Sequence, residues 1–238
     1  MAGTKEERAH EIECFAKGLG ADLVGFADLR KLRGIFTYPE DMIEESPYGI
    51  SIAVGLDKHG KYCNASEDDF AFPLLDKIAH ELKRHIESKG YSAKVIAADK
   101  RVAPNSILYW RGEISHKAVA KTAGIGWIGR STLLVTPALG PRVCLATVVT
   151  DMPLAAGRTM ENRCGKCRIC ISACPLDALK HSLFEEHPRK IEDAIDVVKC
   201  GSFVNKTWRN LELCYECMLA CPKGVRVAKK REAAGRGS

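Results

Sequence analysis

Eight of the eleven cysteines stand in two similar motifs towards the end of the chain. The first motif reads Cys164-Gly-Lys-Cys167-Arg-Ile-Cys170-Ile-Ser-Ala-Cys174-Pro175, which is the spacing C-x2-C-x2-C-x3-C-P. With this spacing, three thiolates bind one 4Fe–4S cluster, and the fourth, next to the proline, binds a different cluster. The first motif therefore predicts a second set of cysteines elsewhere in the chain.

The second set begins 26 residues after Cys174. It comprises Cys200 and the run Cys214-Tyr-Glu-Cys217-Met-Leu-Ala-Cys221-Pro222, where a longer segment replaces one short spacing. If each motif gives its last cysteine to the other, two groups of four result. We call Cys164, Cys167, Cys170 and Cys221 the first cysteine group, and Cys174, Cys200, Cys214 and Cys217 the second cysteine group.

Zinc and disulfide bonds are the alternatives for so many cysteines. Zinc sites use C-x2-C pairs too, but they rarely add a third such cysteine before C-P, and they often recruit histidine. Disulfide bonds need an oxidising compartment, and nothing in the sequence resembles a signal peptide. The spacing favours two iron–sulfur clusters, and it predicts a protein that transfers single electrons.

The composition is ordinary for a globular protein. Hydrophobic residues make up 46% and charged residues 28% of the 238 residues, enough for one good-sized domain and a small one. No apolar run approaches the roughly 20 residues that span a bilayer, so we expect a cytoplasmic protein without membrane contact. The net charge of +6 is mild and by itself does not indicate nucleic-acid binding.

Helices alternate with strands before the cysteines begin. A capping box at Thr4-x-x-Glu7 begins a helix that ends near Gly18, and Ser115 is a plausible N-cap for another. Periodicity predicts helices over residues 70–89 and 116–122, and strands over residues 22–27, 50–56, 92–98, 132–136 and 143–150. The expected fold class is α+β, with an α/β domain over residues 1–155 and a small cluster domain over residues 156–238.

Three closely spaced glycines satisfy the dinucleotide fingerprint G-x-G-x-x-G. They are Gly124, Gly126 and Gly129. That fingerprint requires a strand before it and a helix after it, so that the pyrophosphate meets a helix N-terminus. Here a predicted helix precedes and a predicted strand follows, which argues against a dinucleotide site. The glycines still indicate a backbone held where side chains cannot fit, either for packing or for a flat ligand.

The glycines and cysteines together resemble a known family. The segments over residues 114–134 and 140–151, followed by the cysteine motifs, closely resemble the epoxyqueuosine reductases, which pair an AGxGWxGK-type loop and a downstream TD with the same cysteine pattern. Residues 19–27 look like the opening strand of that family. The resemblance implies a nitroreductase-like α/β domain followed by a ferredoxin-like domain, with cobalamin bound between them, as in reductive dehalogenases.

The resemblance also implies roles for residues of the glycine segment. It implies cofactor contacts at Gly124, Gly126, Trp127, Gly129, Arg130 and Ser131. Dehalogenases use a tyrosine with a basic partner as proton donor, which makes Tyr109 and Arg111 candidates here. His116, which titrates near neutral pH, is a further candidate. Each of these residues also has an interpretation without a catalytic or binding role. Tyr109 could form an apolar lid with its neighbour Trp110, Arg111 could be a surface charge, and the glycine segment could be a tight packing turn.

The sequence departs from that family at three points. The chain ends at Ser238 without the C-terminal helical-repeat domain of the tRNA-modifying members. No aspartate lies between Lys100 and Asp151, where those members place a catalytic aspartate, and Arg130 replaces the usual lysine. These departures make tRNA a less expected substrate than a small molecule.

Three functions remain open. The first is a corrinoid-dependent iron–sulfur reductase, supplied with electrons by an external donor of the ferredoxin or flavodoxin type. The second is an electron-transfer or activating protein that reduces a corrinoid held on a partner. The third is a reductase of the same fold with flavin in place of the corrinoid. The cofactor carries the chemistry in each, while the protein binds and orients it.

Overall fold

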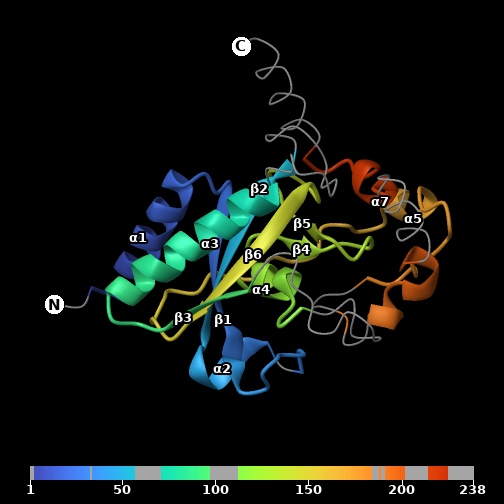
Figure 1. Cartoon of the computed structure of the whole chain (residues 1–238). Helices are drawn as coiled ribbons and strands as arrows, with labels where there is room; N and C mark the ends of the chain where they lie inside the picture. Colours follow the sequence, from blue (N-terminus) through green and yellow to red (C-terminus); the bar gives the residue numbers. More distant parts are fainter. Residues whose placement is uncertain are drawn as a thin grey trace, which may run out of the picture. The chain divides into compact units, whose positions relative to one another are not determined.

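The computed structural model describes residues 3–32, 34–56, 71–96, 112–183, 188, 191–201 and 214–224 (Figure 1). The chain divides into two units. The sheet unit comprises Met1–Val54, Phe72–Ile125 and Cys144–Met160. The cysteine unit comprises Gly55–Ala71, Gly126–Val143 and Glu161–Ser238. The division therefore does not follow one boundary in the sequence, because most of the glycine segment groups with the cysteines.

A four-stranded sheet forms the centre of the sheet unit. Its strands are β1 (Leu23–Asp28), β2 (Tyr48–Gly55), β6 (Val143–Thr150) and β3 (Ala93–Ile96), in the order β1-β2-β6-β3. β1 pairs antiparallel with β2, and β3 pairs antiparallel with β6. All eight residues of β2 are buried, as the sequence predicts for a strand covered on both faces.

Two helices, α1 (Lys5–Gly18) and α3 (Ala71–Ser88), lie side by side in the sheet unit (Figure 1). The rings of Phe15 and His85 stack between them with centroids 4.3 Å apart. The predicted capping box of α1 is present. The apolar stripe of α3 is fully buried at Leu75, Ile78, Leu82 and Ile86. Both helices therefore form as the sequence predicts.

The helix α4 (His116–Thr122) packs against β1. Gly25 of β1 leaves the space that Ala123 and Ile125 occupy at the end of α4, and Gly49 of β2 leaves the space for Val119. Ser115 accepts from the amide of Ala118 and caps the helix, as predicted. The sheet unit is completed by η1 (Leu29–Lys31) and α2 (Met42–Glu45).

The described part of the cysteine unit contains only short elements. They include β4 (Trp127–Ile128), β5 (Leu134–Val135), α5 (Ile169–Ser172), η4 (Ile191–Asp193) and α7 (Glu216–Leu219). β4 and β5 pair antiparallel, and α5 contacts α7. Sequence reasoning predicts one strand over residues 132–136 and misses β4, because glycines flank it.

The protein is thus of mixed α and β structure with a small sheet. Within the described residues, no helix combines the length and the apolar character that crossing a lipid bilayer requires.

Candidate metal centres

The side chain of Asn162 links the loop of the first motif to β4. The side-chain oxygen of Asn162 accepts a hydrogen bond from the amide of Cys164 at 2.9 Å. Its side-chain nitrogen donates to the carbonyl of Ile128 at 2.7 Å. Beyond this anchor, the amide of Cys167 donates to the carbonyl of Cys164 at 3.0 Å and closes a turn. The motif therefore begins as a fixed turn and continues into α5, which carries Cys170.

Two thiols of the first cysteine group, Cys170 and Cys221, have pKa values that burial and the other cysteines of the group raise. Burial raises the pKa of Cys170, and the charges of Cys164, Cys221 and Cys167 raise it further. Burial is also the main cause that raises the pKa of Cys221, and Cys164 and Cys167 contribute to it. Cys221 belongs to the second motif in the sequence. In space it joins the first three cysteines of the first motif.

The second cysteine group lines a cavity of about 50 Å³. All four of its members face this cavity, together with apolar side chains that include Leu176, Leu179 and Ile195. Burial raises the pKa of Cys200, and Cys214 and Cys174 raise it further. Burial, followed by the neighbouring cysteines, raises the pKa of Cys217 to about 12. The last cysteine of the first motif thus lies among the cysteines of the second motif.

The structure therefore places Cys221 near the first three cysteines of the first motif, and Cys174 near Cys200, Cys214 and Cys217. That each set binds a cluster remains a prediction. α5 contacts α7, and Cys174 and Cys221 each follow one of these two helices by two residues, so each lies close to the other motif. The two groups are neighbours, since Cys170 also acts on the titration of Cys217.

The separation of the side chains bears on the choice between zinc and a cluster. A zinc ion binds all of its thiolate ligands at about 2.3 Å, which requires the sulfur atoms to converge on one point. Among the described residues, no three histidine, cysteine or acidic side chains converge closely enough to hold a single ion.

The glycine segment packs against protein rather than against open space. A Cβ atom at Gly126 or Gly129 would collide with Val135 of β5, and one at Gly124 would collide with the backbone of Arg158. The predicted helix does precede the segment, so the dinucleotide alternative fails as expected. These contacts support the packing explanation for the three glycines.

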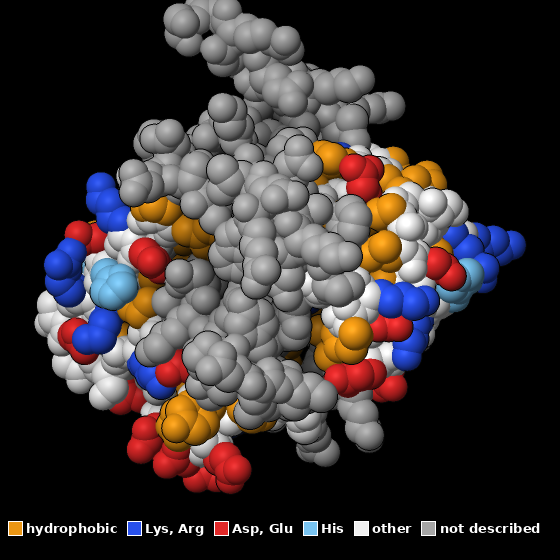
Figure 2. All heavy atoms as spheres, turned by 45° about the vertical axis from the view of Figure 1, so that its right-hand side comes forward, with side chains coloured by type: hydrophobic (Ala, Val, Ile, Leu, Met, Phe, Trp, Pro, Cys, Tyr) orange, Lys and Arg blue, Asp and Glu red, His pale blue; other side chains and the backbone are white. Residues whose placement is uncertain are grey.

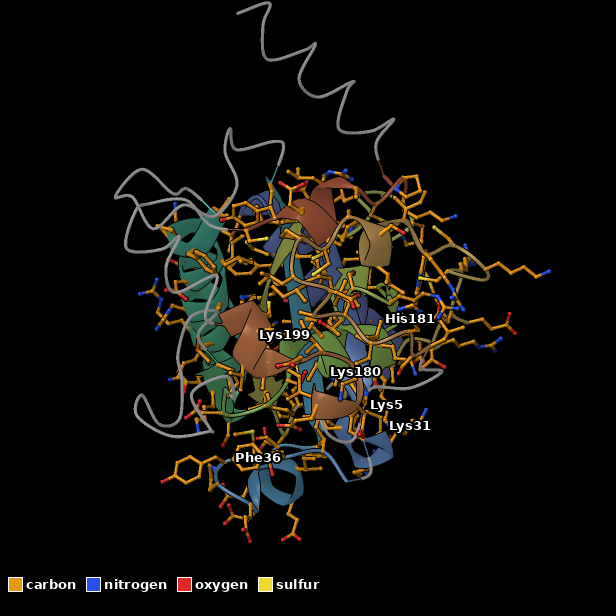
Figure 3. The ribbon with its side chains drawn as sticks, turned by 90° about the vertical axis from the view of Figure 1, so that its right-hand side faces the viewer. Lys5, Lys31, Phe36, Lys180, His181 and Lys199 are labelled. Atoms are coloured by element: carbon orange, nitrogen blue, oxygen red, sulfur yellow. The ribbon has the colours of Figure 1, made fainter. Side chains whose placement is uncertain are left out.

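Two side chains of the glycine segment bind the first cysteine loop directly. The indole Nε1–H of Trp127, which is buried, donates to Sγ of Cys164 at 3.4 Å. The Arg130 guanidinium donates to the carbonyl of Gly165 and to that of His181, each at 2.9 Å. His181 and Lys180 are neighbours in this part of the cysteine unit (Figure 3). Ser131 is buried.

Of the three candidate proton donors, the structure describes only His116. His116 lies in the sheet unit, where its Nδ1 is 2.9 Å from the hydroxyl oxygen of Thr147. Tyr109 and Arg111 lie outside the described residues. Their proposed roles remain predictions.

Sequence reasoning missed Arg142. This side chain is 6% exposed, and its guanidinium donates to three backbone carbonyls around the end of α7. Its positive charge lowers the pKa of Cys221, against the larger rise that burial causes. No local sequence signal reveals this contact, because its acceptors lie 77 to 81 residues further along the chain.

No family model matches the chain. The epoxyqueuosine reductase of Leadbetterella byssophila is 32% identical over 142 residues, which cover 60% of this chain and 40% of that protein. The one from Gloeobacter violaceus is 29% identical over 171 residues, 66% of this chain and 47% of that protein. By sequence, the chain is similar to the epoxyqueuosine reductases. It spans less than half the length of these curated relatives.

Solved structures of the same kind share the fold. A crystal structure of an epoxyqueuosine reductase has a TM-score of 0.68 at 21% identity, covering 93% of this chain and 67% of that one. A catabolic reductive dehalogenase has a TM-score of 0.70 at 22% identity, covering 97% of this chain and 36% of that one. The resemblance predicted from the glycine segment and the cysteine motifs is therefore confirmed.

The exchange of cysteines between the motifs makes a testable prediction. Cys221→Ser should lose the same cluster signal in electron paramagnetic resonance (EPR) spectra as Cys167→Ser, because both belong to the first cysteine group. Cys174→Ser should lose the same signal as Cys200→Ser. Each variant should retain about four of the about eight iron atoms of the wild type. Cys14→Ser, which changes an exposed cysteine outside the motifs, is the control. Matching signals for Cys174→Ser and Cys167→Ser would show that each motif binds its own cluster.

The hydrogen bond from Trp127 to Cys164 makes a second prediction. Hydrogen bonds to sulfur stabilise the reduced, more negative state of a cluster and raise its potential. A hydrogen bond worth about 0.5–1.5 kcal/mol corresponds to at most about 60 mV for one electron. Trp127→Phe should therefore lower one cluster potential by up to about 60 mV, measured by EPR-monitored redox titration. The affected cluster should be that of the first group, whose signal is lost in Cys221→Ser. If Trp127→Phe instead changed the potential of the second cluster, the placement of Trp127 beside the first cluster would be wrong.

Proposed function

We propose that this chain is an oxidoreductase that carries single electrons on two 4Fe–4S clusters, one at each cysteine group. The observation that supports this most strongly is the exchange of Cys174 and Cys221 between the two motifs. The cavity lined by the second cysteine group supports it as well. On this proposal the chain combines a nitroreductase-like sheet unit with a ferredoxin-like cysteine unit.

The chemistry of the thiols fits metal ligation. Burial raises the pKa values of Cys170, Cys200, Cys217 and Cys221, so these thiols hold their protons when no metal is bound. Iron binds the thiolate form, so cluster assembly would release those protons and would be favoured at higher pH. Among the described residues, apolar side chains line the cavity of the second group, and the amide of Ala178 donates to Sγ of Cys174 at 3.4 Å.

We propose a corrinoid as the second cofactor. A bound corrinoid would supply a cobalt centre whose reduced form transfers electrons to the substrate. The proposal is supported by the curated relatives and by similarity to a reductive dehalogenase described as B12-dependent, with a TM-score of 0.69. Residues proposed to border it are those of the glycine segment, Gly124, Gly126, Trp127, Gly129, Arg130 and Ser131. Tyr109, Arg111 and His116 are the proposed proton donors.

The chain's own residues suggest an order for the two cysteine groups. Trp127 and Arg130 of the glycine segment bond to the first cysteine loop. Arg142 and the Trp127 indole also place positive charge and a hydrogen-bond donor beside this group, whereas apolar side chains line the second. Positive charge and hydrogen bonds donated to the sulfur atoms raise the reduction potential of a cluster. An external donor of the ferredoxin or flavodoxin type would thus reduce the second group, and electrons would pass on to the first.

This order makes a prediction about potentials. In an EPR-monitored redox titration of the wild type, the cluster of the first group should be reduced at the higher potential. The signals are assigned from Cys221→Ser and Cys174→Ser, each of which retains the other cluster. A higher potential at the second group would reverse the proposed direction of electron flow.

An anaerobic titration with Co(II) cobalamin tests the corrinoid proposal. If the chain binds it, a base-off Co(II) EPR spectrum should appear and saturate at about one cobalamin per chain. Lysozyme at the same concentration is the control for non-specific effects. An unchanged spectrum of free cobalamin beside intact clusters would contradict the proposal. It would favour an electron carrier for a partner's corrinoid, or a flavin enzyme if the bleached protein shows flavin absorption.

The substrate class is a separate proposal. One structurally similar epoxyqueuosine reductase, with a TM-score of 0.66, is solved with a modified tRNA stem loop. For this chain we favour a small molecule, because no aspartate lies between Lys100 and Asp151. The described face of the cysteine unit also mixes acidic with basic side chains, whereas a nucleic-acid surface is dominated by basic ones (Figure 2).

A further inference from the structure

A buried arginine, which directly precedes β6, joins this part of the chain to the end of the second cysteine motif. Nη1 of Arg142 donates to the carbonyl of Lys223 at 3.0 Å. Nη2 donates to the carbonyls of Leu219 and Cys221, at 2.9 Å and 3.2 Å. The planar guanidinium thus binds carbonyls on both sides of Cys221 and one on that residue itself. Its fixed geometry restrains this backbone more than a flexible ammonium group could.

Two glycines bring the same two segments into direct backbone contact. A Cβ atom at Gly140 would collide with the carbonyl of Lys223, and one at Gly224 would collide with the backbone of Leu139 and Gly140. Both glycines have positive φ, 62° and 77°. The contact therefore tolerates no side chain on either glycine, and it keeps the carbonyl acceptors within reach of Arg142.

The charge of Arg142 needs a counter-charge. The side chain is 6% exposed, and burying an ion costs free energy unless an opposite charge lies nearby. Among the described residues, its side chain donates only to neutral backbone carbonyls. Arg142 acts electrostatically on Cys221, whose thiolate would supply the opposite charge once it is bound to metal.

We propose that Arg142 is a positioning residue for the first cysteine group, which holds Cys221 in place and offsets the negative charge of the ligated thiolates. The inference rests on the proposed iron–sulfur function. The fixed guanidinium positions the ligand, and the positive charge favours the reduced, more negative state of the first cluster.

Two substitutions of Arg142 separate these effects. Arg142→Gln removes the charge, and Arg142→Lys keeps it without the planar fork. In an EPR-monitored titration, Arg142→Gln should lower the reduced-to-oxidised ratio of the first cluster at least tenfold at fixed potential, equivalent to 59 mV for one electron. Arg142→Lys should have a smaller effect. The second cluster should not change in either variant.

Arg84→Gln is the matched control, because it removes the same charge from an exposed site on α3. Equal effects of Arg84→Gln and Arg142→Gln on the first cluster would overturn the inference, as would equal shifts of both clusters in Arg142→Gln. A wild type without clusters would instead remove the proposed function and this inference together. Two wild-type clusters that Arg142→Gln leaves unaltered would remove this inference alone.

Gly140→Ala keeps the inference testable if Arg142→Gln does not fold. The added methyl group would displace the Lys223 carbonyl and weaken the Arg142 contacts while the arginine remains. Gly140→Ala and Arg142→Lys should then both make the first cluster more sensitive to an iron chelator, with the second cluster retained. Loss of both clusters in these two variants would overturn the inference and assign Arg142 to general packing.

Discussion

The cysteine unit depends on one geometric requirement, that each motif must give one cysteine to the other. Each group of four draws three members from one motif and one from the other. Neither group is complete until both segments lie together. The contact between α5 and α7, the close approach of Gly140 and Gly224, and the Arg142 hydrogen bonds all serve this requirement. The described part of the unit has few regular elements, and on the proposed function specific side chains and bound metal would replace a large apolar core.

Local sequence signals predict the sheet unit well. The capping box of α1, the apolar stripe of α3 and the Ser115 cap of α4 each depend on residues a few positions apart, and all three are present. The strand over residues 143–150 is also found as predicted. The β4–β5 pair was harder to predict. Two-residue strands between glycines carry too little periodicity to be recognised.

Part of the candidate site can likewise be predicted from local sequence, and part of it cannot. The cysteine spacing carries its own geometric rule, so the two groups follow from the sequence without any structure. The residues that position those cysteines cannot be predicted in this way, because the hydrogen-bond acceptors of Trp127 and Arg142 lie 37 or more positions away in the sequence. A buried arginine before a strand looks like any other basic residue in the sequence. Only its three carbonyl contacts distinguish it.

The glycine segment acquires a different meaning from these contacts. On sequence grounds its glycines could make room for a flat ligand or for close packing, and β5 fills the space beside Gly126 and Gly129. Trp127 and Arg130 then use their polar groups on the first cysteine loop. The main observed role of the segment is therefore to hold that loop in position. If a corrinoid also binds to it, the first cysteine group is the one coupled to that cofactor through shared residues, and the apolar second group is the one left to meet an electron donor.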